Sequence, residues 1–514
     1  LLSRIYDICI HLQGLKRQTS IHAAGVIISS KQLDRYIPIY KSDGEVVAGY
    51  TMNYLENLGF LKMDFLSLDN LSLVSSLLKE IGNVDFNNIP LDDKKTIELF
   101  KTANTDGIFQ FETLGMKNIL RKFNVSCFED LCVIIALFRP GPIDNIDEYI
   151  KRKNNEKRIS YISEDLKPIL EDTYGIIIYQ EQIMQIARKM AGYSLGEADI
   201  LRRAMSKKNH IIMEEEREKF VNRSVKNGYD KNVSISVYNL IYKFADFGFN
   251  KSHSVGYATL AFKMGYLKAH YPNYFISHLL TSVIGNDIKT KKYIEEAKSN
   301  DINILKPCIN KSELNYVTDD NSILFSLVAI HNINNIFIRD ILKERENGLF
   351  TDFLDFMRRC YNDANKNSII SLINAGCFDI FGYNHKTLID NLDIAINYSQ
   401  LTKKLDESLI TKPEFDICEE YSKDELIRKE YETFGFYLSY HPVQSKRKNN
   451  MNSKLISKYF NKSINIYLLI DKINQITTKK GEKMAFVTAS DEFGEVDIVI
   501  FPKLYESNYN INRG

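Results

Sequence analysis

The sequence predicts a multidomain α+β protein, and three observations lead to this fold class. The chain has 514 residues, more than one hydrophobic core usually organises, so several domains are expected. Apolar residues recur with helical spacing from about Pro90 to Tyr271. From residue 464 onward apolar and polar residues alternate instead, which is typical of strands. A largely helical region followed by a β-rich unit is therefore expected.

Residues 1–75 are predicted to hold part of a β-sheet. Short apolar runs alternate with turns there, and the runs Ala24–Ser29 and Phe60–Leu66 read as strands. Both runs are apolar at nearly every position. This continuity indicates strands that are covered on both faces.

Residues 76–300 are predicted to be mainly helical. The clearest helix is Glu181–Ala191, in which four apolar residues follow the i, i+3, i+4, i+7 spacing of one helix face. These four residues are Ile183, Ile186, Ala187 and Met190. Weaker helical patterns cover Asp93–Phe100 and Leu260–His270, and Pro272 is expected to end the second of them.

The remaining boundaries follow from composition. Residues 301–382 hold several short helical patterns. Residues 383–462 are polar and charged, with a basic run at Ser445–Lys454, which is typical of a linker or a loosely packed helical segment. Residues 463–514 form the β-rich unit. Its expected strands are Ile464–Ile470, Met484–Ala489 and Val496–Phe501.

Glycine and proline mark the expected tight turns. The stretch from Arg139 to Pro142 has to turn, because two prolines flank a glycine. In the β-rich unit, Gly481 and Gly494 supply hairpin turns between the expected strands.

Composition restricts the class of protein. Hydrophobic residues make up 44% and charged residues 26%, an ordinary balance for a soluble globular chain. The net charge is only +1, so a nucleic-acid surface has to come from local clusters. The seven cysteines are scattered without zinc spacing, and no apolar run approaches the ~18 residues of a membrane span. We expect a cytoplasmic protein without a membrane segment, and an internal stretch of a longer chain.

Nine blocks of sequence point to a family: SIHAAGVIIS (20–29), GFLKMDFLSLDNL (59–71), GIFQFETLGMKNIL (107–120), FEDLCVIIALFRPGP (128–142), TYGIIIYQEQIMQIARKMAGYSLGEADILRRAMSKK (173–208), FADFGFNKSHSVGYA (244–258), YLKAHYP (266–272), FGFYLSYHP (434–442) and GEKMAFVTASDEFGEVDIVIFP (481–502). The residues in these blocks, and the order of the blocks along the chain, resemble the alpha subunit of bacterial DNA polymerase III, a replicative polymerase of the C family. The resemblance runs from about residue 10 to the C-terminus. The β-rich unit follows the helical region, which resembles the main alpha subunit rather than the Gram-positive variant.

The resemblance implies an architecture. Residues 1–75 would be the C-terminal part of a nucleotidyltransferase-like palm sheet, with an exposed edge and an uncovered apolar face because strands are missing. Residues 76–300 would form the fingers, and residues 301–382 a helix-hairpin-helix DNA-binding region. Residues 383–462 would be a linker with a clamp-binding segment. Residues 463–514 would start an OB-fold β-barrel.

The resemblance also implies an activity. It is template-directed DNA synthesis in chromosome replication, in which deoxynucleoside triphosphates are added to a primer 3′ end and pyrophosphate is released. The implied partners are primer-template DNA, single-stranded template DNA, the sliding clamp and other replicase holoenzyme subunits. The alternative is a non-catalytic DNA-binding paralogue or scaffold that retains the fold.

Two Mg²⁺ ions serve the chemistry of this family, and Asp64 matches its third metal-binding aspartate. We therefore expect Asp64 to be a catalytic metal ligand. From the residues alone, a capped or salt-bridged strand aspartate is the competing interpretation. The other two aspartates belong to a DxD motif that no residue pair before Asp64 matches, so residues 1–514 alone are expected to be inactive.

The resemblance places seven residues near the incoming nucleotide: His22, Lys62, Arg202, Arg203, Asn250, Ser252 and His253. Tyr179, Gln180 and Glu181 are expected to shape the same pocket. Each assignment has a plainer alternative. Lys62 could be a lysine at the rim of the site, and His22 a hydrogen-bonded structural histidine. The two arginines could lie on a solvated helix of mixed charge, and the group from Asn250 to His253 could be a helix cap.

Further residues are expected to contact DNA or the clamp. Lys207 and Lys208 would touch the template backbone or lie on a solvated face. The hairpin HNINN would bind duplex phosphates through Asn332, Asn334 and Asn335, although it lacks the usual glycine. Lys479, Lys480 and Lys483 would contact single strands, with Phe486 either beside them or in the core. Ser408, Leu409 and Ile410 stand nearest to a clamp-binding peptide.

Overall fold

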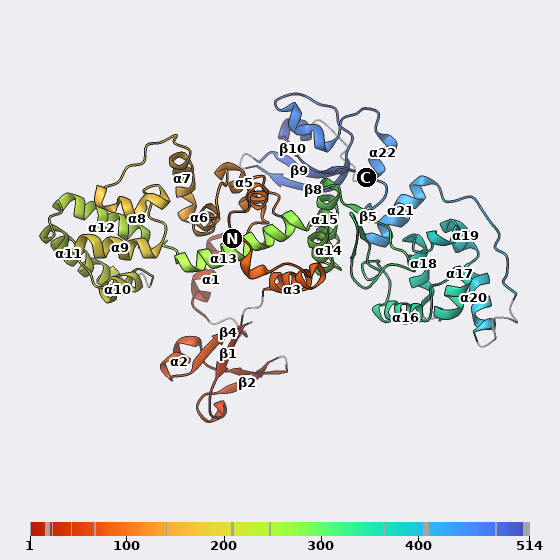
Figure 1. The fold of residues 1–514 in the computed structure, drawn as a ribbon, viewed down its shortest axis with the longest axis horizontal. Coiled ribbons are helices and arrows are strands. Elements are labelled where there is room, and N and C mark those ends of the chain that lie inside the picture. Colours follow the sequence, from red (N-terminus) through yellow and green to blue (C-terminus); the bar gives the residue numbers. More distant parts are fainter. Residues whose placement is uncertain are drawn as a thin grey trace. The chain divides into compact units, whose positions relative to one another are not determined.

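The computed structural model describes residues 2–15, 21–22, 24–42, 44–65, 68–139, 141–206, 210–245, 248–362, 365–403, 411–478 and 481–506. The chain forms two compact units, Leu1–Ser72 and Leu73–Gly514. Many helices and several small sheets occur in one chain (Figure 1), so the expected α+β class is confirmed.

The first unit contains two small antiparallel sheets, β1–β4 and β2–β3. Its elements are α1 (Leu2–Leu12), β1 (Gly25–Ile28), η1 (Leu33–Arg35), β2 (Ile39–Ser42), β3 (Glu45–Ala48), α2 (Met52–Asn57) and β4 (Leu61–Asp64). Both strands expected near the N-terminus are present. They pair with Gly25 opposite Asp64 and Ile28 opposite Leu61.

The apolar face of the β1–β4 sheet is not covered. Val26, Ile28, Leu61 and Met63 lie on this face, and between 40% and 58% of each is exposed. The expectation that both faces are covered is therefore wrong for the residues described, whereas the expectation of an uncovered apolar face is confirmed. Two strands of four residues each present too little surface to close a core by themselves.

The second unit begins with a helical body. Its α-helices are α3 (Asp69–Ile81), α4 (Lys94–Lys101), α5 (Leu114–Phe123), α6 (Phe128–Leu137), α7 (Ile146–Lys153), α8 (Lys167–Leu170), α9 (Gln180–Ala191), α10 (Leu195–Ser206), α11 (His210–Lys226), α12 (Lys231–Ala245), α13 (Lys251–His270), α14 (Pro272–Ser282) and α15 (Asp287–Ser299). Short 3₁₀ turns are η2 (Phe86–Asn88), η3 (Pro142–Asn145), η4 (Glu164–Leu166) and η5 (Glu171–Thr173). The three helices predicted from periodicity are all present. Pro272 follows the end of α13, as expected, and also starts α14.

Helix α13 is central to this body, because it packs against both α6 and α4. Figure 1 shows it as a long helix among its neighbours. Phe100, Phe111 and Phe262 are fully buried in the shared core. Gly265 allows the close approach of α13 to α4, since a Cβ there would lie 2.7 Å from the ring of Phe100.

The turn expected between Arg139 and Pro142 is present. Gly141 adopts φ +97°, a conformation that other residues rarely adopt, and η3 begins at the next residue. The turn redirects the chain after α6. It leaves Arg139 at the end of that buried helix.

The third region combines a small sheet with helices. The sheet has the order β5–β7–β6, with strands β5 (Asn303–Leu305), β6 (Val317–Asp319) and β7 (Ser322–Leu324). The helices that follow are α16 (Asn335–Arg345), α17 (Phe353–Cys360), α18 (Lys366–Asn374), η7 (Asp379–Phe381), α19 (His385–Asp390) and α20 (Leu392–Thr402). Short helices were expected here, whereas the strands were not. Strands of three residues are too short to show a period.

The segment 324–334 contains no helix. It consists of the end of β7 and a series of turns, and α16 follows it. Residues 324–345 thus hold one helix rather than a hairpin between two, which corrects the expected local structure. Ser326 explains part of this, because its hydroxyl donates to the backbone oxygen of Leu314 and ties the segment to the preceding loop.

The last region joins the core and then forms a sheet. Its elements are α21 (Lys423–Phe434), α22 (Pro442–Lys446), η9 (Ser453–Tyr459), β8 (Leu469–Thr477), β9 (Lys483–Asp491), β10 (Gly494–Ile500) and α23 (Pro502–Glu506). Phe434, Phe436 and Leu438 are buried in the same core as the helical body. The antiparallel sheet has the order β10–β9–β8. Two of the three expected strands correspond to β9 and β10. The first was placed too early, because residues 464–468 form no strand and β8 runs from Leu469 to Thr477.

Candidate active site

In the first unit, the structure brings together His22, Lys62 and Asp64. The Nζ atom of Lys62 lies 2.9 Å from Oδ1 of Asp64 and 3.4 Å from Nε2 of His22. Nε2 of His22 lies 3.9 Å from Oδ1 of Asp64. Two groups that can be cationic therefore face one carboxylate on the polar face of the β1–β4 sheet.

Strand geometry produces this cluster. Lys62 and Asp64 are two residues apart, so their side chains leave the same face of β4. Gly25 lies opposite Asp64, and a Cβ there would approach Cε of Lys62 to 2.7 Å. The glycine thus leaves room for the lysine side chain, of which only 13% is exposed.

Backbone donors orient the ring of His22. Nδ1 accepts hydrogen bonds from the N–H groups of Gly25 at 2.8 Å and Ala24 at 3.2 Å. In the neutral ring the proton therefore lies on Nε2, the atom that faces Lys62 and Asp64. His22 is therefore a hydrogen-bonded histidine, as the alternative for this residue predicted. Asp64 forms a salt bridge with Lys62, as the competing interpretation of Asp64 predicted.

The first unit offers one carboxylate in this cluster. Among the described residues, no group of three or more His, Cys, Asp or Glu side chains lies close enough together to hold a metal ion. Asp64 is also paired with Lys62. These residues by themselves do not fit a site for two Mg²⁺ ions, which needs several oxygen ligands.

In the second unit, a separate cluster surrounds the start of α13. The side chain of Asn250 caps the helix by accepting from the N–H of His253 at 2.8 Å. The carboxylate of Glu181, in the first turn of α9, accepts from the N–H of Lys251 at 3.0 and 3.1 Å. The helix cap that was the plainer alternative for this group is therefore present.

A short backbone pairing holds α9 and α13 in this arrangement. Tyr179 and Phe249 form a parallel bridge, with the N–H of Gln180 donating to the oxygen of Phe249 at 2.9 Å. The N–H of Phe249 donates to the oxygen of Ile178 at 3.1 Å. Segments about seventy residues apart in sequence thereby meet, and both helices start at the same place.

Cationic and aromatic side chains line this helix start. The guanidinium of Arg139 lies 4.4 Å from the ring centre of Phe249, and Nζ of Lys251 lies 5.5 Å from that of Tyr179. His253 contacts the ring of Phe249. Burial lowers the pKa of Arg139 and raises that of Tyr179, so the tyrosine stays neutral at physiological pH. The helix N-terminus adds a partial positive charge.

Sequence reasoning did not identify Arg139 as part of this cluster. The available signal was its position, directly after an apolar helix and before the Pro-Gly-Pro turn. An arginine at the end of a buried helix needs a partner that disperses its charge, and an aromatic face is one such partner.

Arg202 and Arg203 lie on α10 and share one carboxylate. Nη2 of Arg202 and Nε of Arg203 each lie 2.8 Å from an oxygen of Asp199. The hydrogen bond from Arg202 lowers the pKa of Asp199. The side chain of Arg203 is 69% exposed, so it remains open to an anion from solution. Without a bound nucleotide, Arg202 and Arg203 belong to a helix of mixed charge, as the alternative interpretation predicted.

The asparagines of the expected hairpin have separate roles. Asn332 adopts φ +62°, so it does take the left-handed conformation expected of a glycine replacement. The side chain of Asn334 caps α16 by accepting from the N–H of Ile336 at 2.9 Å. Asn335 is the exposed first residue of that helix.

In the last sheet, Lys483 begins β9 and is exposed, and 44% of Phe486 is exposed. Phe486 is therefore a surface residue rather than a core residue. The other predicted contacts lie outside the described residues: Lys207, Lys208, Ser408, Leu409, Ile410, Lys479 and Lys480.

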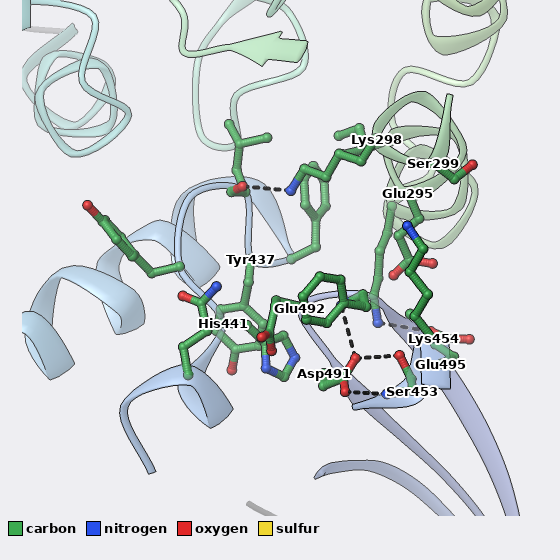
Figure 2. A pocket seen from close by; sticks show the side chains of 18 of the residues that line it. Glu295, Lys298, Ser299, Tyr437, His441, Ser453, Lys454, Asp491, Glu492 and Glu495 are labelled. Carbon is green, nitrogen blue, oxygen red and sulfur yellow. Dashed lines mark hydrogen bonds and ion pairs between the residues drawn. The ribbon is translucent and has the colours of Figure 1, made fainter. Parts of the chain in front are cut away.

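A cavity of about 490 Å³ lies between α15, residues 436–444 and the turn from β9 to β10. We call it the hairpin cavity. Figure 2 shows Glu295 and Lys298 reaching it from α15, with Glu492 and Glu495 on the strand side. Lys291 donates to Glu495 at 2.9 Å, and burial raises the pKa of Glu295 to about 7. The cavity therefore holds a carboxyl group that titrates near neutral pH.

No helix in the described part of the chain is both long and apolar enough to cross a membrane.

Three family models match the chain. The bacterial DNA polymerase III alpha NTPase domain matches residues 1–67, the finger domain of the same subunit matches residues 68–228, and a helix-hairpin-helix motif matches residues 301–388. The boundary between the first two models lies close to the division between the two compact units. The last model covers the short sheet and the helices α16 to α18.

Curated relatives align along nearly the whole chain. The DNA polymerase III subunit alpha of Bacillus subtilis (strain 168) is 41% identical over 525 residues, covering 98% of this chain and 47% of the relative. That of Staphylococcus aureus (strain MRSA252) is 41% identical over 516 residues, covering 98% and 48%. The chain thus spans about half the length of the curated relatives that it matches.

Proposed function

Because the chain belongs to the family of bacterial DNA polymerase III alpha subunits, we propose that it carries nucleotide-binding and DNA-binding parts of a replicative DNA polymerase. The reaction would be template-directed addition of deoxynucleoside triphosphates to a primer 3′ end, with release of pyrophosphate. The observation that carries this proposal is the start of α13. Arg139, Lys251 and His253 gather there around a helix N-terminus, which suits a triphosphate.

The proposal gives the nucleotide a second set of contacts on α10. Arg203 would exchange one oxygen of Asp199 for a phosphate oxygen when a nucleotide enters, and Arg202 would hold the carboxylate in place. A phosphate carries more charge than the carboxylate and offers more acceptor oxygens, so the exchange is favourable. Asn250 and Ser252 would then orient the start of α13 toward the same anion.

In the first unit, Lys62 and His22 would supply side chains that bind phosphate oxygens. Asp64 would contribute one carboxylate to the metal chemistry of this family, which supplies charge neutralisation at the reacting phosphate when the metal is bound. Among the described residues, Asp64 is the one carboxylate of this cluster, and one carboxylate does not hold two metal ions.

The same proposal assigns the other regions. Residues 1–75 would belong to a palm, residues 76–300 to the fingers and residues 463–514 to an OB fold. Residues 383–462 would carry a clamp-binding segment, but they are not a loosely packed linker, because Leu388, Leu392 and Phe434 are buried in the main core. The helix-hairpin-helix region at residues 301–382 would bind duplex DNA near Asn332, Asn334 and Asn335. Partners would be primer-template DNA, single-stranded template, the sliding clamp and other replicase subunits.

One observation favours a second function, a non-catalytic DNA-binding paralogue or scaffold. The carboxylate of Asp64 is already satisfied by Lys62 at 2.9 Å, as in an ordinary structural ion pair. A scaffold would keep the fold and the DNA contacts without using this carboxylate in catalysis.

A chimera tests the two functions. Residues 1–514 replace the aligned stretch of the Bacillus subtilis relative, and primer extension is measured with Mg²⁺ and all four nucleotides. The polymerase proposal predicts extension. A chimera that binds primer-template DNA but does not extend it would favour the scaffold. Residues 1–514 alone are expected to bind DNA without extending it, because one carboxylate does not hold two metal ions.

A further inference from the structure

The segment between the helical body and the last sheet has an unusual charge. Residues 445–470 contain six basic residues and no acidic residue, in a chain whose net charge is only +1. The basic residues are Lys446, Arg447, Lys448, Lys454, Lys458 and Lys462. We call residues 446–462 the basic segment. Its charge marks it as a local site for an anionic partner.

The arginine of this segment fastens it to the last sheet. Nη2 of Arg447 lies 2.7 Å from Oε2 of Glu492 and 3.3 Å from Oδ2 of Asp491. Ser453 donates to Asp491 through its N–H at 2.7 Å and through its hydroxyl at 2.5 Å. The acidic side chains of the β9–β10 turn are thereby used for anchoring, and they do not neutralise the lysines.

All five lysines of the basic segment are exposed, and among the described residues none makes an ion pair. Lys454 stands at the rim of the hairpin cavity (Figure 2), where Glu495 is already paired with Lys291. Cations that are close together in sequence and have no acidic partner repel one another, so a chain of phosphates that replaces their counterions binds favourably.

Exposed aromatic rings lie at the end of the same segment. Phe460 is 83% exposed and Tyr459 is 42% exposed, and Tyr467, a few residues later, is 36% exposed. A phenylalanine with this exposure contributes little to the core. Bases of single-stranded DNA can stack on such rings, whereas bases in a duplex are already stacked on each other. The combination of free lysines and exposed rings therefore favours a single strand over a duplex.

We propose that the basic segment is a binding surface for single-stranded DNA, with Lys454, Lys458 and Lys462 contacting phosphates and Phe460 stacking on a base. This deepens the proposed function and rests on it, because it names a path for unpaired template. The surface is distinct from the sheet residues Lys483 and Phe486. It adds a contact that precedes the sheet in the chain.

The first experiment uses residues 1–514 and an oligothymidylate of about 20 nucleotides, longer than the roughly 4–16 nucleotides that one OB fold covers. Affinity is measured by anisotropy across a salt series for wild type and for a variant with Lys454→Gln, Lys458→Gln and Lys462→Gln. Each lost phosphate contact lowers the salt slope by about 0.7, so the slope should fall by about 2.

A charge-matched control separates a local contact from net charge. Lys226, Lys231 and Lys243 on α11 and α12 are also exposed and make no ion pair among the described residues, and they are replaced by glutamine together. The proposal requires this control to keep the wild-type slope. Equal losses in both variants would overturn it, because they would show a general charge effect. An unchanged slope in the first variant would also overturn it and would leave an acidic protein as the partner to examine.

A second experiment tests stacking. A 2-aminopurine placed in the oligonucleotide is quenched when it stacks on an aromatic ring. Phe460→Leu should lower the affinity by between about fivefold and a hundredfold and remove the quenching, since stacking contributes about 1–3 kcal/mol per base. Retained quenching in this variant would show that Phe460 is not the ring on which the base stacks. Phe486→Leu should leave this quenching unchanged if the basic segment supplies the ring.

The outcomes also separate this inference from the proposed function. If wild-type residues 1–514 bind neither the oligonucleotide nor primer-template duplex, the proposed function fails. If they bind both, and the triple lysine variant loses neither, only the basic segment is wrongly assigned. The expected result is a variant that loses single-strand affinity and keeps duplex affinity.

Discussion

The β1–β4 sheet and the helical body around α13 differ in how far their apolar side chains are buried. The sheet holds His22, Lys62 and Asp64 on one face and leaves apolar side chains exposed on the other. The body instead buries Phe100 and Phe262 completely, and its candidate site residues Asn250, Lys251 and His253 lie where α13 begins. The sheet cluster therefore depends on local strand register, whereas the α13 cluster depends on long-range packing.

This difference predicts how each cluster responds to substitution. A polar residue on the sheet can change without disturbing a core, since its strand neighbours are already exposed. A residue near α13 shares its position with packed helices, so function and stability are coupled there.

Asp64→Asn should have the largest effect, and it should act on activity alone. In the active chimera, primer extension should fall by several orders of magnitude, each factor of ten corresponding to about 1.4 kcal/mol in the barrier. The proposal needs a negative carboxylate at this position, and asparagine has the same shape without the charge. Circular dichroism should stay unchanged. Turnover above about a tenth of wild type would exclude a catalytic role for Asp64.

Phe100→Ala should destabilise the helical body by about 3–5 kcal/mol, because it leaves a cavity beside the rings of Phe111 and Phe262. Urea unfolding followed by circular dichroism measures the change. Met63→Ala is the matched control on the exposed sheet face, and it should change the unfolding free energy by less than about 0.5 kcal/mol. Similar losses in both variants would contradict the contrast between the two regions.

Glu295→Gln should make stability less dependent on pH. Burial raises the pKa of Glu295 from 4.5 to about 7, so the folded protein binds a proton that the unfolded chain releases. Stability then falls as pH rises from about 4.5 to 7 and is level above that range. The variant should gain up to about 3 kcal/mol over wild type at pH 8 and nothing at pH 4.

Thermal or urea unfolding at several pH values checks this, with Glu492→Gln as the control on the other side of the cavity. Glu492 is paired with Arg447, so its loss should destabilise the protein at neutral pH rather than stabilise it. A Glu295→Gln variant that is no more stable than wild type at pH 8 would show that the carboxyl group is better solvated than the structure indicates.

Arg203→Ala should raise the apparent KM for nucleotides in the chimera by about tenfold, because a phosphate contact of about 1.5 kcal/mol or more is lost. Duplex affinity should change little. Arg217→Ala on α11 is a control, since that arginine pairs only weakly with Glu214 at 3.5 Å. Loss of primer-template binding with an unchanged KM would instead place Arg203 on the DNA path.

Asn334→Ala should have the smallest effect, a loss of about 1 kcal/mol in the unfolding free energy from the missing cap of α16. The neighbouring Asn335→Ala should be nearly neutral, because that side chain is exposed and makes no capping bond. Unfolding by urea compares the two. If both variants lose duplex affinity without losing stability, the asparagines contact DNA directly.

Much of the fold was predictable where one periodic pattern dominates. The apolar stripe of Glu181–Ala191 and the alternation in the last strands both correspond to observed elements. The strands β5, β6 and β7 were missed because three residues carry no usable period. The coverage of the first sheet was misjudged, since apolar continuity says what a strand could bury and not whether anything lies on it.

The sequence by itself determined the family resemblance, the main elements and the residue types of the candidate site. Tertiary structure decided which of these residues meet. The bridge between Tyr179 and Phe249 places Glu181 beside Lys251, and the turn at Gly141 leaves Arg139 against Phe249. Spacing along the chain describes only one helix or strand at a time. Contacts between distant segments arise when the packed core fixes the helices in three dimensions, so only the folded chain shows them.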